Sequence, residues 1–153
     1  NPNAVLHPLQ ELYNAENRSR FFPEGCRYDY IVDAIDLVSC KLDLAETARR
    51  LKIPLMMALG TGNKLDPSQL RLADISETYG CPLARVMRKE LRNRGICRQP
   101  VVFSPEQPAP TTQRETPPPG RRSVPASNPW VPAVAGLLIG SKVVRDLIAN
   151  KGV

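Results

Sequence analysis

The sequence predicts an α/β protein, on the evidence of two buried strands and the helix between them. Residues 28–36 and 53–59 are short, nearly continuous apolar runs, as is typical of parallel strands covered on both faces. Residues 39–52 lie between them and place apolar side chains at helical spacing, with charged side chains on the other side. A strand, a helix and a strand in this order predict a right-handed βαβ unit with parallel strands.

Further elements follow along the chain. Residues 70–75 alternate between apolar and polar, which predicts a half-exposed strand. Pro82 stands where a helix can begin, and the amphipathic pattern after it ends near Gly95. Residues 101–103 predict a short last strand, and residues 131–149 return to helical spacing.

A proline-rich stretch separates the last two elements. Residues 105–129 hold eight of the sixteen prolines and almost no large apolar side chain, so they cannot bury enough surface to fold alone. We expect three parts: an α/β unit over residues 1–104, a flexible crossover loop over 105–129, and a C-terminal helix over 130–153 that packs back on the same unit.

The composition favours a protein with an anionic partner. The formal charge is +6 and the pI is about 9.4, which suits binding to phosphates, although a basic, solvated surface explains the charge equally well. No apolar stretch approaches the roughly 20 residues of a membrane span, and no signal peptide is visible, so we expect a cytoplasmic protein. No C-x-x-C pair occurs, which predicts reduced, structural thiols at Cys26, Cys40, Cys81 and Cys97.

One acid is placed for binding chemistry. In an open α/β sheet, ligands collect beyond the carboxyl ends of the parallel strands, and Asp36 closes the first predicted strand. Its carboxylate suits a magnesium ion that carries nucleotide phosphates, because hard cations prefer oxygen ligands. The alternative is that Asp36 caps the next helix, and the pattern alone favours this alternative. Asp33, nearer the strand interior, fits a satisfied buried polar residue.

Two cationic features are weaker candidates. The loop from Gly60 to Lys64 follows the second strand and offers backbone N–H groups and an ammonium to an anion, but such loops are more often simple turns. The predicted helix after Pro82 carries a basic face that suits an RNA backbone, although a solvated face is the commoner explanation. That face consists of Arg85, Arg88, Lys89 and Arg92.

Several motifs, taken together in order and spacing, resemble the threonylcarbamoyladenosine dehydratase branch of the ThiF/MoeB-type adenylating proteins. They are the Asp-Tyr-Ile-Val-Asp-Ala-Ile-Asp string of residues 29–36 with Lys41, the Gly-Thr-Gly-Asn-Lys-Leu-Asp-Pro string of residues 60–67, and residues 73–76, 81–88 and 131–137. The resemblance implies a Rossmann-like ThiF-type domain whose N-terminal nucleotide-binding half, with its glycine loop and phosphate-holding Arg and Lys, lies upstream of residue 1.

The resemblance also implies an activity. Such an enzyme uses ATP and Mg²⁺ to adenylate the carboxylate of N6-threonylcarbamoyladenosine in tRNA, and ring closure then expels AMP and leaves a cyclic, dehydrated nucleoside. Asp36 matches the family's nucleotide- and magnesium-binding acid, and Leu37 matches a backbone contact to the nucleotide. A homodimer and a sulfur-transfer partner are further expectations. The alternatives are an activator of a ubiquitin-like sulfur carrier, and a non-enzymatic module that keeps dimerisation or RNA-binding surfaces.

Overall fold

The protein contains a four-stranded mixed sheet. The structure, a computed structural model, describes residues 1–110, 112, 116–117 and 124–150. Within these residues the strands β1 (Ile31–Asp33), β2 (Leu55–Ala58), β3 (Arg71–Asp74) and β4 (Pro100–Phe103) take the order β1-β2-β4-β3. β1, β2 and β4 are parallel, and β3 is antiparallel to β4. The carboxyl ends of the three parallel strands therefore share one edge of the sheet.

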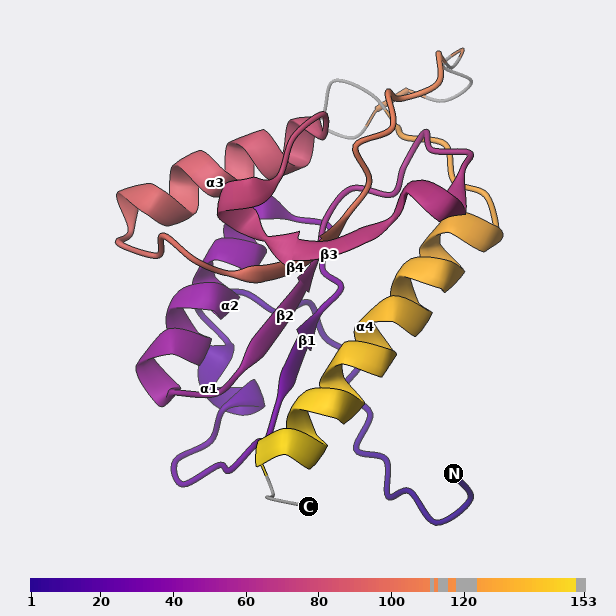
Figure 1. Cartoon of the computed structure of the whole chain (residues 1–153). Coiled ribbons are helices and arrows are strands. Elements are labelled where there is room, and N and C mark those ends of the chain that lie inside the picture. The colour runs from indigo at the N-terminus through magenta and orange to yellow at the C-terminus, as the bar shows by residue number, and fades with distance from the viewer. Residues whose placement is uncertain (111, 113–115, 118–123, 151–153) are drawn as a thin grey trace.

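Helices cover both faces of this sheet (Figure 1). α2 (Val38–Leu51) and α3 (Pro82–Asn93) lie on one face, and α4 (Trp130–Asn150) lies on the other. The remaining elements are short: α1 (Arg18–Phe21) and the 3-10 turns η1 (Pro67–Gln69) and η2 (Ile75–Glu77). The predicted α/β class is confirmed. The boundaries proposed for the three parts of the chain stay a prediction, and part of the stretch 105–129 lies outside the described residues.

Side chains of the strands point alternately to the two faces of the sheet and contribute to a hydrophobic cluster on each face. Met57 and Val101 point toward α2 and α3 and belong to the larger cluster. Their neighbours Met56 and Val102 point to the opposite face, where they pack with Val131 and other residues of α4. Because side chains of a strand alternate between faces, a strand covered on both sides is apolar throughout, as the sequence predicted for β2.

β1 is shorter than the sequence predicted. The apolar run of residues 28–36 indicated a single strand, but only residues 31–33 pair with β2. The strand ends because the carboxylate of Asp33 accepts a hydrogen bond from the backbone N–H of Ile35, at 2.9 Å, and so turns the chain. Asp36 therefore lies in the connection to α2 and not at the end of the strand itself.

β1 forms one edge of the described sheet, and Val32 in its centre is 49% exposed. The N-terminal segment before α1 exposes Val5 and Leu6 in the same way. This segment is anchored at Tyr13, whose hydroxyl donates to Asp43 of α2 at 2.6 Å, and Arg18 pairs with the same carboxylate. An apolar strand edge invites further pairing. Among the described residues, no helix is long and apolar enough to cross a membrane.

Candidate functional site

Asp36 lies at the carboxyl edge of the sheet, in the connection from β1 to α2. Its side chain is exposed, and the next residue, Leu37, is the N-cap of α2. Leu37 forms no side-chain capping hydrogen bond, and Asp36 lies one residue before this N-cap. The edge position predicted for this acid is the one at which open α/β sheets bind ligands.

The start of α2 adds a positive potential beside this carboxylate. Backbone N–H groups in the first turn of a helix carry partial positive charge, and here the N-cap residue Leu37 forms no side-chain capping hydrogen bond and the first turn contains no acid. A carboxylate with such N–H groups suits a magnesium nucleotide, since Mg²⁺ is usually held by one or two carboxylates together with phosphates. Among the described residues, no cluster of three His, Cys, Asp or Glu forms a complete metal cage.

A buried ion pair lies beneath this connection. The Nζ of Lys41 is 2.9 Å from Oδ2 of Asp33, and the two side chains are 1% and 0% exposed. Burial raises the pKa of Asp33, while the charge of Lys41 acts in the opposite direction. Burial lowers the pKa of Lys41, and the charges of Asp33 and Asp36 both oppose this lowering. Asp33 is thus a satisfied buried polar residue, as the sequence indicated.

The loop after β2 is not arranged as an anion site. Lys64 is 3% exposed, and its ammonium donates to the backbone carbonyl of Glu106. The carboxylate of Glu106 accepts the backbone N–H groups of Leu65, at 2.9 Å, and Asp66, at 3.1 Å. The ammonium of Lys64 therefore holds the chain after β4 instead of facing a ligand.

Asn63 joins both described ends of the proline-rich stretch to this loop. Its backbone carbonyl accepts the N–H of Ala109 at 2.7 Å. Its backbone N–H donates to the carbonyl of Ala126 at 2.8 Å, and its side-chain oxygen accepts the N–H of Ala126 at 2.7 Å. Residues 109 and 126, far apart in sequence, are therefore held at one point near the carboxyl edge.

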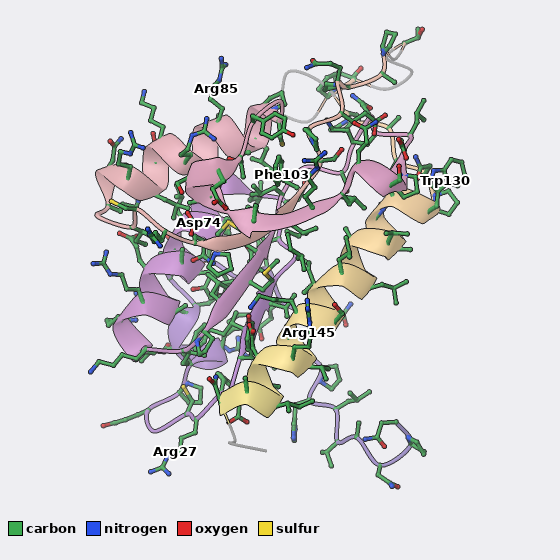
Figure 2. All side chains as sticks on the ribbon, viewed as in Figure 1. Arg27, Asp74, Arg85, Phe103, Trp130 and Arg145 are labelled. Carbon is green, nitrogen blue, oxygen red and sulfur yellow. The ribbon has the colours of Figure 1, made fainter. Side chains whose placement is uncertain are left out.

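The four predicted basic residues of α3 separate into two groups. Arg85, Lys89 and Arg92 are exposed, and none forms an ion pair with any residue that the structure describes. Figure 2 shows Arg85 extending away from the body of the protein. Arg88 instead donates to the carbonyl and hydroxyl oxygens of Thr78, both at 2.6 Å. Its guanidinium is engaged within the fold.

Other reactive side chains lie elsewhere or have structural partners. Cys81 is buried, and its Sγ accepts the N–H of Ala84 as the N-cap of α3, at 3.5 Å. Cys40 is also buried, Cys26 is partly buried, and Cys97 is exposed.

A cavity of about 540 Å³ opens at the opposite edge of the sheet, where Leu55 and Pro100 line it. It is therefore separate from the edge that carries Asp36.

An acid beyond the carboxyl ends of parallel strands is typical of α/β proteins that bind a ligand at that edge of the sheet. Comparison with known proteins identifies which of these proteins the chain is similar to. No family model matches the chain. The tRNA threonylcarbamoyladenosine dehydratase of Bacillus subtilis is 36% identical over 159 residues, which cover 98% of this chain and 62% of that protein. The dehydratase 2 of Saccharomyces cerevisiae is 39% identical over 110 residues, 71% of this chain and 25% of that protein.

Solved structures agree with these relatives. The E. coli tRNA N6-threonylcarbamoyladenosine dehydratase in complex with ATP superposes with a TM-score of 0.79 at 27% identity, over 99% of this chain and 60% of that one. Its complex with AMP gives a TM-score of 0.80 at 26% identity, with the same coverage. The chain is therefore similar to the C-terminal part of the tRNA threonylcarbamoyladenosine dehydratases, which confirms the predicted resemblance. It spans about 62% of the Bacillus protein.

Proposed function

We propose that the chain is part of an ATP-dependent enzyme that dehydrates N6-threonylcarbamoyladenosine in tRNA to its cyclic form. The observation that carries this proposal is the exposed carboxylate of Asp36 at the carboxyl edge, beside the start of α2, in a chain similar to dehydratases over 98% of its length. That the E. coli relative was solved with ATP and with AMP supports adenylation as the chemistry.

In this proposal, Asp36 binds the magnesium ion that accompanies the nucleotide, and the backbone at Leu37 contacts the nucleotide. The substrate carboxylate attacks the α-phosphate of ATP and displaces pyrophosphate, so that its poor leaving group is converted into a good one, AMP. Mg²⁺ held by Asp36 would offset charge on the phosphates during this step. Ring closure then expels AMP. The chain contains no G-x-G-x-x-G motif, so the glycine loop that the resemblance places upstream is needed to hold the phosphates.

The tRNA is proposed to follow the basic face of α3. Arg85, Lys89 and Arg92 are spaced four and three residues apart on one side of this helix and are exposed. Such a row supports contact with successive phosphates of a backbone, which positions a nucleic acid without reading its sequence. Arg88 takes an indirect part, since its guanidinium binds Thr78 and holds the start of α3.

The assembly and location are also proposals. An apolar row on the outer side of α4 supports a homodimer: Leu137 is 73% exposed, and Val144 follows seven residues later. A helix that is apolar on most sides is usually covered. The cytoplasm is the compartment in which we expect the enzyme, and family resemblance alone suggests a sulfur-transfer protein as a further partner.

The test is conversion of the substrate by the purified full-length enzyme, which includes the upstream glycine loop. Incubation with Mg-ATP and tRNA that carries threonylcarbamoyladenosine is expected to remove one water from the nucleoside and release AMP, measured by mass spectrometry. Asp36→Asn is expected to abolish this conversion. Asp29→Asn is the matched control, because it makes the same chemical change near the opposite end of β1. Equal conversion by both variants contradicts the role of Asp36.

Two outcomes favour the alternatives. Adenylation of the C-terminal glycine of a sulfur-carrier protein, without conversion of tRNA, supports a carrier-activating enzyme. Retention of tRNA without binding of Mg-ATP, by a protein that includes the upstream glycine loop, supports a non-enzymatic module. The dehydratase names of the relatives favour the enzyme over both alternatives.

A further inference from the structure

The buried ion pair of Lys41 and Asp33 binds both backbone groups of Ile35, a residue of the connection that carries Asp36. The Nζ of Lys41 donates to the carbonyl oxygen of Ile35 at 2.8 Å, as well as to Asp33 at 2.9 Å. The other oxygen of the Asp33 carboxylate accepts the N–H of Ile35 at 2.9 Å. The two charged side chains thus fix the backbone donor and the backbone acceptor of Ile35, the residue immediately before Asp36.

Stability alone does not explain this pair. Moving two charges out of water is costly, and well-packed apolar side chains of similar volume usually serve a core at least as well. The pair lies between β1 and α2, where Asp33 ends the strand and Lys41 stands in the first turns of the helix. A buried network with every member satisfied rigidifies its surroundings, and this one connects only elements that flank Asp36.

We propose that Lys41, together with Asp33, is a positioning residue that holds the Asp36 carboxylate in place for Mg²⁺ at the nucleotide site. This inference rests on the proposed role of Asp36. Lys41 is buried beneath the connection and is not proposed to contact the metal. Supporting residues of this kind orient a metal ligand, and their loss typically lowers metal affinity about 10- to 100-fold.

The test uses a variant that leaves no unpaired charge in the core. Lys41→Met alone strands the Asp33 carboxylate and risks loss of folding, so the variant is Lys41→Met/Asp33→Asn, whose amide oxygen still accepts the N–H of Ile35. We expect this protein to fold cooperatively. Hydrogen exchange of the backbone amides of residues 34–37 is expected to accelerate at least tenfold relative to the amides of β2. Unchanged exchange in a folded variant overturns the proposal.

The second measurement concerns the metal. In the full-length enzyme, the Mg²⁺ concentration for half-maximal ATP binding is expected to rise about tenfold or more in the double variant. In an Asp36→Asn background the same two changes are expected to add nothing, because they act through that carboxylate. The positioning role is overturned if the double variant leaves the Mg²⁺ midpoint unchanged. It is also overturned if the two changes raise the midpoint as much in the Asp36→Asn background as they do in the unaltered enzyme. If Asp36→Asn itself leaves the Mg²⁺ midpoint unchanged while exchange accelerates as expected, the proposed function of Asp36 fails and the rigidifying role of the pair stands.

Discussion

The basic face of α3 gives a prediction whose magnitude follows from the structure. Arg85, Lys89 and Arg92 are exposed, and none forms an ion pair within the part of the chain that the structure describes, so each is available to one phosphate. Each phosphate contact contributes about 0.7 to 0.9 to the slope of log K against log salt concentration. Changing all three residues to glutamine is therefore expected to reduce this slope by about 2 to 3 in tRNA binding.

The control removes the same charge from another place. Arg27, Lys52 and Arg145 are exposed, and Figure 2 shows Arg27 and Arg145 far from Arg85. Changing these three to glutamine lowers the net charge equally, but we expect the slope to change by less than about 1. The assay is fluorescence anisotropy of labelled tRNA at several salt concentrations. Equal reductions of the slope by both triple variants refute a localised face on α3.

Arg88 provides an internal contrast on the same helix. Because its guanidinium bonds to Thr78, Arg88→Gln is expected to lower the free energy of unfolding by about 1 to 3 kcal/mol in urea titration. The salt dependence of tRNA binding is expected to stay nearly unchanged. If Arg88→Gln lowers the slope of log K against log salt concentration by about 1 and leaves the free energy of unfolding unchanged, Arg88 contacts tRNA and does not serve the fold.

Two further predictions concern the scaffold. Gly80 has a φ of 69°, and a Cβ there meets the carbonyl oxygen of Pro105 at 2.5 Å, whereas Gly25, with a φ of 77°, has open space. In urea titrations, Gly80→Ala is expected to cost about 1 to 3 kcal/mol more than Gly25→Ala, and equal costs contradict the predicted clash. For Asp43, burial acts to raise the pKa, but hydrogen bonds from the guanidinium and phenol beside it outweigh burial and lower the pKa below 3.8. Its stabilising contribution is therefore present above that pH and is lost as the pH falls through the lowered value. Asp43→Asn is therefore expected to flatten the acid side of the stability profile, measured by urea titration at a series of pH values, and an unchanged acid side contradicts this role of Asp43.

The sequence located the regular elements well where a period extends over many residues. α2 begins at Val38 and ends at Leu51, against a predicted helix of residues 39–52, and α3 begins at the predicted Pro82. The strand before α2 was predicted too long, because an apolar run does not show where pairing stops. That end was set by a hydrogen bond from the backbone N–H of Ile35 to the side chain of Asp33, a local signal that composition alone does not distinguish from an ordinary strand residue.

For the candidate site, the sequence predicted the position of the key acid but not the contacts of the charged side chains near it. The position of Asp36 at the carboxyl edge followed from the order of strand and helix, because parallel strands bring their ends together. Whether a charged side chain near that edge faces a ligand or the protein was not visible in the sequence. Lys64 and Arg88 matched the pattern of anion-binding cations, yet they donate to Glu106 and Thr78.

The sequence by itself determined the α/β class, the course of the long helices and the resemblance to the dehydratases, because these depend on periodicity and on motifs of fixed spacing. Only the tertiary structure decided the antiparallel direction of β3, the ion pair of Asp33 and Lys41, and the connection of residues 109 and 126 through Asn63. The physical reason is that a polar side chain can satisfy its hydrogen bonds in many ways. The choice among partners is made by segments that only folding brings together.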